Sequence, residues 1–188
     1  MKNNIIGRKS EQDTLARIYE SRQSEFVAVC GRRRVGKTFL VREYFEQEMV
    51  FQTSGLAGGN TQEQLKNFFY TLRRYDRNVT SVPHDWLDAF EMLITYLDSL
   101  NGIERKVIFL DELPWMDTAG SNFISALEHF WNGWASARRD IVLIVCGSAT
   151  SWMMDKLINN HGGLYGRLTH RLFLQPFSLG ESEAFLNK

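Results

Sequence analysis

Residues 31–38 of this chain spell Gly-Arg-Arg-Arg-Val-Gly-Lys-Thr and match the phosphate-binding loop pattern G-x-x-x-x-G-K-[ST] at every fixed position. Gly31 and Gly36 let the backbone turn and present successive N–H groups to phosphate oxygens. Lys37 has the reach for the β- and γ-phosphates of a nucleotide, and the Thr38 hydroxyl is a suitable ligand for Mg²⁺. The motif therefore predicts a site for ATP or ADP together with Mg²⁺.

The residues on either side of the loop decide whether this match is accidental. Glu25–Cys30 is a short apolar run that predicts a buried strand. After the loop, apolar residues at 40, 41, 44 and 45 fit one face of a helix over about 37–47. A Gly-containing turn with a chance Lys-Thr pair explains neither flank. Strand, loop and helix in this order aim the positive end of the helix dipole at a bound phosphate.

The overall composition is that of an ordinary soluble globular chain. It has 188 residues, of which 44% are hydrophobic and 23% charged. The 22 basic and 22 acidic residues balance, which excludes a strong global field for nucleic acid or an anionic membrane. No apolar run approaches the roughly 20 residues that span a bilayer, and the N-terminus lacks the apolar core of a signal peptide. We therefore expect a cytoplasmic protein with no membrane partner.

Cysteine and histidine predict neither a disulfide framework nor a metal cluster. Cys30 and Cys146 each end an expected buried strand, and we interpret both as small buried thiols. The four histidines, at 84, 129, 161 and 170, are scattered along the chain.

Apolar strands alternate with amphipathic helices along the rest of the chain. Ser10, with Asp13, resembles the N-cap of a first helix. Further helices are expected around 65–75, 86–100, 123–134 and 150–158, strands at 49–53, 106–111, 141–146 and 171–174, and Gly-rich loops at 54–60 and 159–166. Uncharged strands separated by helices predict an α/β fold of three layers, in which helices cover both faces of a parallel sheet.

Two carboxylates follow the strand expected at 106–111. Asp111 and Glu112 would lie at the carboxyl edge of the sheet, which is where open α/β sheets bind ligands. Asp111 suits the Mg²⁺ shell, directly or through water. Glu112 suits a general base that polarises the attacking water. The alternative is a strand end that carries two solvated acids.

Ser148 and Arg167 are the remaining catalytic candidates. The Ser148 hydroxyl is expected to face the γ-phosphate or the attacking water, although it could instead cap the helix that follows. A Gly-rich segment at 162–166 precedes Arg167, which suits an arginine finger that acts in trans on a neighbouring copy. Arg167 could equally pair with a nearby acid, and Arg171 is the second candidate for the finger.

The arginines inside the loop, Arg32, Arg33 and Arg34, stay open to two interpretations. Loop positions of this kind usually offer their backbone to phosphate, which leaves their side chains to face solvent or a partner. One of the three could instead contact a phosphate through its side chain.

Four segments together resemble the archaeal-type ATPases of the STAND branch of the AAA+ P-loop NTPases. In that family an N-terminal segment borders the adenine, the phosphate loop is the Walker A motif, an acidic strand end is the Walker B motif, and a G-R…L-x-P-F-S segment lies close to the fifth strand. The matching segments are Ile5-Ile6-Gly7-Arg8 with Glu11, the loop at 31–38 with its arginine run, Val107–Trp115, and Leu164–Phe177 followed by Ser178. They cover nearly the whole chain.

The resemblance implies a sheet of order 5-1-4-3-2 in one nucleotide-binding domain over 1–188. In such proteins a helical lid and a C-terminal domain follow, and this chain would be truncated before them. In that order the strands that end in Cys30 and Cys146 are neighbours, so we expect their thiols to lie close together but unbonded. The resemblance also assigns nucleotide contacts to Gly7, Arg8, Gly31, Arg32, Arg33, Arg34, Val35, Gly36, Lys37, Thr38 and Phe39.

Two functions fit these residues. Glu112 beside Asp111 favours ATP binding and Mg²⁺-dependent hydrolysis, coupled to conformational change in a larger protein. The alternative is a nucleotide-dependent signalling or assembly switch with little intrinsic hydrolysis. An arginine finger at Arg167 would require a homo-oligomer.

Two other functions are disfavoured. The Asp-Glu pair and the absence of an evident arginine-rich lid argue against a small-molecule kinase. Nucleic-acid binding through Arg73, Arg74 and Arg77 is not evident, because such charges more often solvate the end of a helix.

Overall fold

The computed structural model describes residues 5–148, 150–159 and 162–187, in which strands and helices alternate. The strands are β1 (Glu25–Gly31), β2 (Met49–Ser54), β3 (Lys106–Asp111), β4 (Ile141–Gly147) and β5 (His170–Leu174). The helices are α1 (Lys9–Glu20), α2 (Lys37–Tyr44), α3 (Thr61–Tyr75), α4 (Trp86–Ser99), α5 (Phe123–Gly133), α6 (Thr150–Met153) and α7 (Leu179–Leu186). A π-helical turn at Met154–Ile158 continues α6, so the helical stretch predicted at 150–158 is confirmed.

The strands form one parallel sheet in the order β2-β3-β4-β1-β5. Seen from the other edge, this is the predicted order 5-1-4-3-2, and it confirms the three-layer α/β/α fold. Strands β3 and β4 lie in the interior of the sheet and are buried along their whole length. Burial on both faces explains why each appears in the sequence as a continuous apolar run rather than an alternating one.

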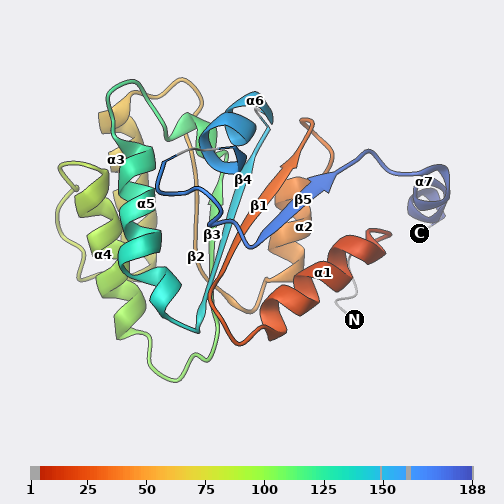
Figure 1. Ribbon diagram of the computed structural model, residues 1–188, viewed down its shortest axis with the longest axis horizontal. Coiled ribbons are helices and arrows are strands. Elements are labelled where there is room, and N and C mark those ends of the chain that lie inside the picture. The colour runs from red at the N-terminus through yellow and green to blue at the C-terminus, as the bar shows by residue number, and fades with distance from the viewer. Residues whose placement is uncertain (1–4, 149, 160–161, 188) are drawn as a thin grey trace.

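Helices cover both faces of the sheet (Figure 1). Helices α3, α4 and α5 pack on one face, where aromatic rings dominate the core and Trp86 meets Phe123 edge to face at 4.8 Å. Helices α1 and α2 cover the other face with a smaller, mostly aliphatic core. The apolar side chains that these two helices bury are Leu15, Ile18, Leu40 and Val41. The sheet thus lies between two hydrophobic layers.

The expected closeness of the two thiols is wrong, although the strand order behind it is right. In the β1–β4 register Cys146 lies opposite Val29, and Cys30 lies opposite Gly147. Because side chains alternate along a strand, this offset of one residue sends Cys30 into the core under α3–α5 and Cys146 into the core under α1 and α2. Both cysteines are free and buried, and burial raises the pKa of Cys30 to about 11.

The predicted N-cap at Ser10 is also wrong. Helix α1 begins at Lys9, and its N-cap is Arg8, which adopts a left-handed conformation with φ 55°. Ser10 lies inside the first turn, where its hydroxyl donates to Glu11 Oε2 at 3.1 Å. Asp13 pairs with Lys9 at 2.6 Å. The helix starts one residue before Ser10 because Arg8 has partners elsewhere in the fold that fix its backbone, as described below.

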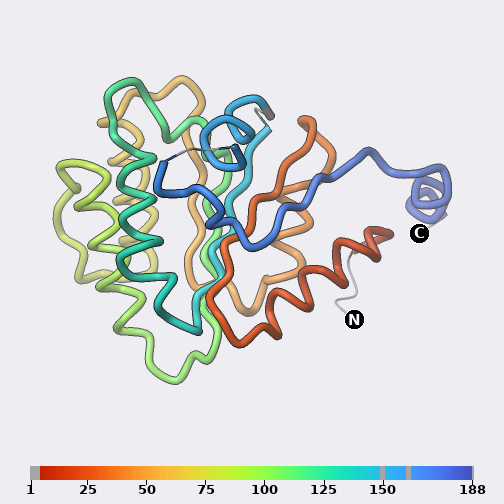
Figure 2. The backbone as a smooth tube through the Cα atoms, in the orientation of Figure 1, coloured from red at the N-terminus to blue at the C-terminus, as the bar shows by residue number. Residues whose placement is uncertain are grey.

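The chain leaves β5, runs past the beginning of α1 and ends in α7 at one end of the molecule (Figure 2). Helix α7 buries none of its side chains, and Leu179 and Leu186 are strongly exposed. Across the ranges that the structure describes, no helix combines the length and apolarity needed to cross a membrane.

Candidate functional site

The phosphate-loop motif joins β1 to α2 at the carboxyl edge of the sheet. Gly31 has φ 150°, and a Cβ there would lie 2.6 Å from the Leu174 carbonyl oxygen of neighbouring β5. Gly36 is the N-cap of α2, with φ 89°. Both positions therefore require glycine, one because of a close approach and the other because of its backbone conformation. Arg34 also takes a left-handed conformation, φ 66°, which completes the turn.

Lys37 folds back over its own loop. Its side chain is buried, and its ammonium group donates to the carbonyl oxygens of Gly31 and Arg32, each at 2.9 Å. The positive charge thus lies at the centre of the loop, where two backbone carbonyl oxygens accept from it. A phosphate that entered the loop would exchange these carbonyl contacts for charge-assisted ones, which are stronger.

Thr38 and Asp111 are brought together from α2 and the end of β3. The Thr38 hydroxyl donates to Asp111 Oδ2 at 2.8 Å, and the other carboxylate oxygen of Asp111 accepts from the Glu112 N–H at 2.9 Å. Asp111 is only 5% exposed. A hydroxyl and a carboxylate at this separation form the all-oxygen donor set that a hard cation such as Mg²⁺ prefers. The residues present therefore fit the predicted cation.

Glu112 stands at the point where β3 ends. Its backbone is left-handed, φ 48°, because a 3₁₀ turn at Leu113–Trp115 begins directly after it. Its carboxylate accepts a hydrogen bond from the Ser148 hydroxyl at 3.1 Å, and Ser148 follows β4, the strand between β1 and β3. The two acids that follow β3 are therefore not simply solvated. Asp111 turns to the loop and Glu112 turns to Ser148.

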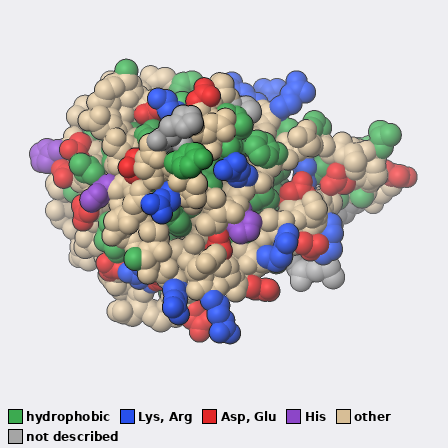
Figure 3. All heavy atoms as spheres, in the orientation of Figure 1, with side chains coloured by type: hydrophobic (Ala, Val, Ile, Leu, Met, Phe, Trp, Pro, Cys, Tyr) green, Lys and Arg blue, Asp and Glu red, His purple; other side chains and the backbone are tan. Residues whose placement is uncertain are grey.

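A polar cavity of about 610 Å³ lies between these elements. Figure 3 shows Lys and Arg side chains gathered over the loop that follows β1. Three of the described lining side chains are cationic and one is acidic, so the cavity suits a polyanion. The lining residues are Arg33, Arg34, Gly36, Lys37, Thr38, Phe39, Gly55, Ala57, Glu112 and Trp115.

A second, apolar cavity of about 520 Å³ adjoins the first. Arg34, Gly36 and Phe39 line both cavities. The remaining lining residues come from the N-terminal segment, the loop and the segment after β5, namely Ile6, Arg8, Val35, Pro176, Phe177 and Phe185. A ligand with an anionic part and a flat apolar part could therefore occupy both cavities at once.

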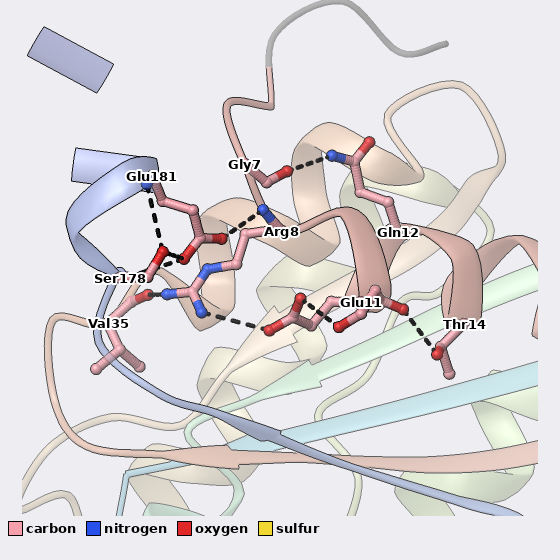
Figure 4. A network of polar contacts seen from close by, with 9 residues as sticks. Gly7, Arg8, Glu11, Gln12, Thr14, Val35, Ser178 and Glu181 are labelled. Carbon is pink, nitrogen blue, oxygen red and sulfur yellow. Dashed lines mark hydrogen bonds and ion pairs between the residues drawn. The ribbon is translucent and has the colours of Figure 1, made fainter. Parts of the chain in front are cut away.

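Arg8 connects the three segments that border the apolar cavity (Figure 4). Its guanidinium donates to the Val35 carbonyl oxygen at 3.0 Å and lies 4.6 Å from the centre of the Phe177 ring. Its backbone N–H donates to Glu181 Oε1 at 2.8 Å. The N–H of Arg8 and the N–H and hydroxyl of Ser178 hold the pKa of the Glu181 carboxyl below its usual range. Gly7, also predicted to contact nucleotide, adjoins this network, and its carbonyl accepts from Gln12 at 2.8 Å.

Sequence reasoning missed Glu181 and Phe185. Helix α7 begins with a capping box, in which Ser178 accepts from the Glu181 N–H and the Glu181 carboxylate accepts from the Ser178 N–H. The spacing Ser-x-x-Glu is a recognised start signal for a helix. It would have placed α7 correctly, but nothing in it predicts the contact of Glu181 with Arg8, 173 residues away. Gly55, Ala57 and Trp115 were also not predicted to line the site.

Some predicted residues are not brought to the cavities. Arg32 and Arg167 are exposed, and neither is among the described residues that line either cavity. The Arg167 N–H donates to the Leu164 carbonyl oxygen at 3.1 Å, which closes a turn before β5. Arg171 points outward from the edge strand β5. For Arg167 and Arg171, contact with a nucleotide in a neighbouring molecule stays a prediction.

Three comparisons with known proteins agree with the fold and the loop. An uncharacterized protein of Methanocaldococcus jannaschii is 26% identical over 184 residues, which is 98% of this chain and 38% of the relative. The Walker-type ATPase of Pyrococcus abyssi superposes with a TM-score of 0.71 at 18% identity, over 98% of this chain and 57% of its own. The Aeropyrum pernix ORC2 protein in its ADP form gives a TM-score of 0.61 at 19% identity, over 98% and 54% of the two chains.

The chain therefore spans only part of the length of these relatives, 38% of the first and 57% of the second. At these identities the two solved structures establish the fold. The family pattern described as an ATPase domain found predominantly in Archaea matches residues 6–188, which is almost the whole chain. Together with the P-loop fold, this match assigns the chain: it belongs to that archaeal ATPase family.

Proposed function

We propose that this ATPase-type P-loop domain binds ATP with Mg²⁺ and hydrolyses it, and that hydrolysis drives a conformational change in a longer protein. The observation that carries the proposal is the Thr38–Asp111 hydrogen bond of 2.8 Å. It joins the loop to the end of β3, and Glu112 follows there as a candidate base. Phosphate contacts, cation ligands and a general base thus belong to one edge of the sheet, which is where α/β sheets bind their ligands.

In this proposal the phosphates lie on the loop. Lys37 exchanges its two carbonyl partners for β- and γ-phosphate oxygens, and the first N–H groups of α2 point at the same anion. Thr38 and Asp111 would hold Mg²⁺, which would supply positive charge against the phosphate oxygens. The flat base occupies the apolar cavity, where Phe39 and Phe177 offer apolar surface to it. The ADP form of the Aeropyrum pernix relative supports an adenine nucleotide.

Glu112 is the proposed general base. It has to leave the Ser148 hydroxyl, or share it, in order to take a proton from water. Ser148 is then free to contact the water or the terminal phosphate. Arg167, which is exposed, acts only if a second copy of the chain presents it in trans, so this part of the proposal requires a homo-oligomer.

One observation favours the alternative function, a nucleotide-dependent switch with little intrinsic hydrolysis. The carboxylate of Glu112 is already engaged by Ser148 at 3.1 Å. This hydrogen bond occupies one acceptor site of the carboxylate and holds it toward Ser148 rather than toward a water, so nucleotide would be held longer before it is hydrolysed. The two functions therefore differ in whether Glu112 is released once ATP binds.

The test is Mg²⁺–ATP binding and single-turnover hydrolysis by this chain and by two variants. We expect Lys37→Ala to lose binding, because the loop loses its central charge. We expect Glu112→Gln to bind ATP with nearly unchanged affinity but to lose hydrolysis by a factor of about 10² or more. Binding without hydrolysis in the parent chain would support the switch instead. Absence of binding in the parent chain would refute both functions for this chain.

A further inference from the structure

The three consecutive arginines of the loop differ in what they face. Arg33 lines only the polar cavity, and Arg34 lines both cavities. Arg32 is exposed and is not among the described residues that line either one. The left-handed turn at Arg34 reverses the chain there, so that neighbouring side chains leave the loop in different directions. The three arginines thus have three different surroundings, and of them Arg33 alone lines the polar cavity without also lining the apolar one.

Arg33 is also the arginine that reaches the candidate base. Its Nε donates to Ser148 Oγ at 3.5 Å, and Ser148 Oγ donates in turn to Glu112 Oε2 at 3.1 Å. A hydroxyl has one proton to give and lone pairs to receive, so Ser148 can serve both contacts at once. The guanidinium charge therefore approaches the Glu112 carboxylate through a single hydroxyl group.

The contact of Arg33 with Ser148 is easily exchanged. A donor–acceptor distance of 3.5 Å is at the long end for a hydrogen bond, and Arg33 is exposed, so little is lost when the contact breaks. A phosphoryl oxygen offers the same guanidinium a charge-assisted and commonly bidentate partner, which is considerably stronger. The guanidinium should therefore prefer a terminal phosphate to the serine whenever one is within reach.

From this geometry we propose that Arg33 distinguishes nucleoside triphosphate from diphosphate within its own chain. When a triphosphate occupies the polar cavity, the Arg33 guanidinium leaves Ser148 and binds the γ-phosphate. Ser148 then loses its donor, and the Ser148–Glu112 pair loses the neighbouring positive charge that favoured it. A diphosphate has no γ-phosphate to bind, so Arg33 stays on Ser148. This role rests on the proposed function, and it makes Arg33 a residue that acts in cis, unlike Arg167.

The test compares ADP with a non-hydrolysable ATP analogue, each with Mg²⁺, by calorimetric titration of the parent chain, Arg33→Ala and Arg32→Ala. We expect Arg33→Ala to weaken binding of the ATP analogue about 10-fold or more and that of ADP less than about 2-fold, because only the γ-phosphate contact is lost. Arg32→Ala is the matched control, with the same charge removed one residue away. Its two affinities should change by one common factor, because Arg32 is not among the described residues that line either cavity and its loss removes only general positive charge from the loop.

Two further measurements distinguish loss of the γ-phosphate contact from unfolding of the variant. The melting temperature of ligand-free Arg33→Ala should stay within a few degrees of the parent, and Arg33→Lys should restore part of the affinity for the ATP analogue. Equal weakening of both nucleotides by Arg33→Ala would overturn the inference. The inference would also be overturned if the parent chain binds both nucleotides and Arg33→Ala keeps the same ratio of the two affinities. If the parent chain binds neither nucleotide, the proposed function fails and the inference fails with it.

Discussion

Arg8 links the phosphate loop to the segment after β5, and its replacement should weaken the contact between the two. Only 6% of it is exposed, although it carries a charge and lies within the first few described residues. Its guanidinium contacts the Val35 carbonyl at 3.0 Å and the Glu11 carboxylate at 3.4 Å (Figure 4). It also lies 4.6 Å from the centre of the Phe177 ring. The perturbation is Arg8→Ala, which removes all three contacts and leaves the backbone hydrogen bond to Glu181 in place.

The magnitude follows from the contacts one by one. A hydrogen bond with a charged donor contributes about 1.5–3 kcal/mol, and here the acceptor, the Val35 carbonyl, would be left without it. The cation–π contact with Phe177 adds about 0.5–1 kcal/mol, and the Glu11 pair adds about 0–1 kcal/mol. Return of water to the vacated space offsets part of this. We therefore expect Arg8→Ala to lower the free energy of unfolding by about 2–3 kcal/mol, which for a domain of this size lowers the melting temperature by roughly 4–12 °C.

The assay is thermal unfolding combined with amide hydrogen exchange, and Lys9→Ala is the matched control. Lys9 is the adjacent cation, but its side chain is 81% exposed and pairs with the half-exposed Asp13. Its removal should cost less than about 0.5 kcal/mol. In Arg8→Ala the amides of α7 should exchange faster, because α7 buries no side chain and depends on the contacts of its flanking segment.

Equal melting temperatures for Arg8→Ala and Lys9→Ala, together with unchanged exchange in α7, would refute this reasoning. They would show that the contacts of Arg8 are compensated when it is lost. A large fall in melting temperature with α7 still protected would refute only the link to α7. Arg8 would then stabilise the loop alone, through Val35.

Two further variants test the sheet and its carboxyl edge. Arg138 and Lys106 hold the pKa of Asp140 well below its usual range, so its stabilisation is present above about pH 4 and is lost as the pH falls through the depressed folded value. Asp140→Asn leaves buried Lys106 unpaired, so at pH 7 it should lower the free energy of unfolding, measured by chemical denaturation, by about 2–3 kcal/mol. The difference in unfolding free energy between variant and parent should become smaller below about pH 4. A difference that does not depend on pH would contradict this. Gly55→Ala places a Cβ 2.6 Å from the Glu112 carbonyl oxygen, so it should displace Glu112, lower hydrolysis more than ATP binding and destabilise the chain by about 1–3 kcal/mol. Its control is Gly180→Ala, where a Cβ meets nothing within 4 Å; equal hydrolysis by the two variants would refute the steric argument.

The parts of the fold that could be predicted from the sequence are those governed by local chemistry. Apolar runs such as Ile141–Gly147 become buried strands because a parallel sheet that is covered on both faces hides every side chain of an interior strand. The loop could be predicted because Gly31 and Gly36 occupy backbone positions that other residues avoid. The pairing of Thr38 with Asp111 then follows, since both stand at the carboxyl edge of neighbouring parts of one parallel sheet.

The parts that could not be predicted depend on register and on distant contacts. The faces to which Cys30 and Cys146 point are decided by an offset of one residue between β1 and β4, which strand order does not specify. Helix α1 begins at Lys9 because the backbone of Arg8 donates to Glu181. No local signal at the N-terminus contains information about a partner in the last helix, so local capping rules placed the start wrongly.

The polar groups of the site are paired within the chain, and this bears on how a nucleotide could bind. Lys37 is engaged by loop carbonyls, Thr38 by Asp111, and Glu112 by Ser148. Binding ATP would therefore exchange hydrogen bonds rather than add them, and such exchanges contribute little net free energy unless charge is gained. On the proposed function, affinity has to come from phosphate charge on Lys37 and Arg33 and from burial of the base in the apolar cavity. Raised salt should then weaken the contribution of exposed Arg33 more than that of buried Lys37 or of the apolar cavity, because exposed charges are screened most strongly.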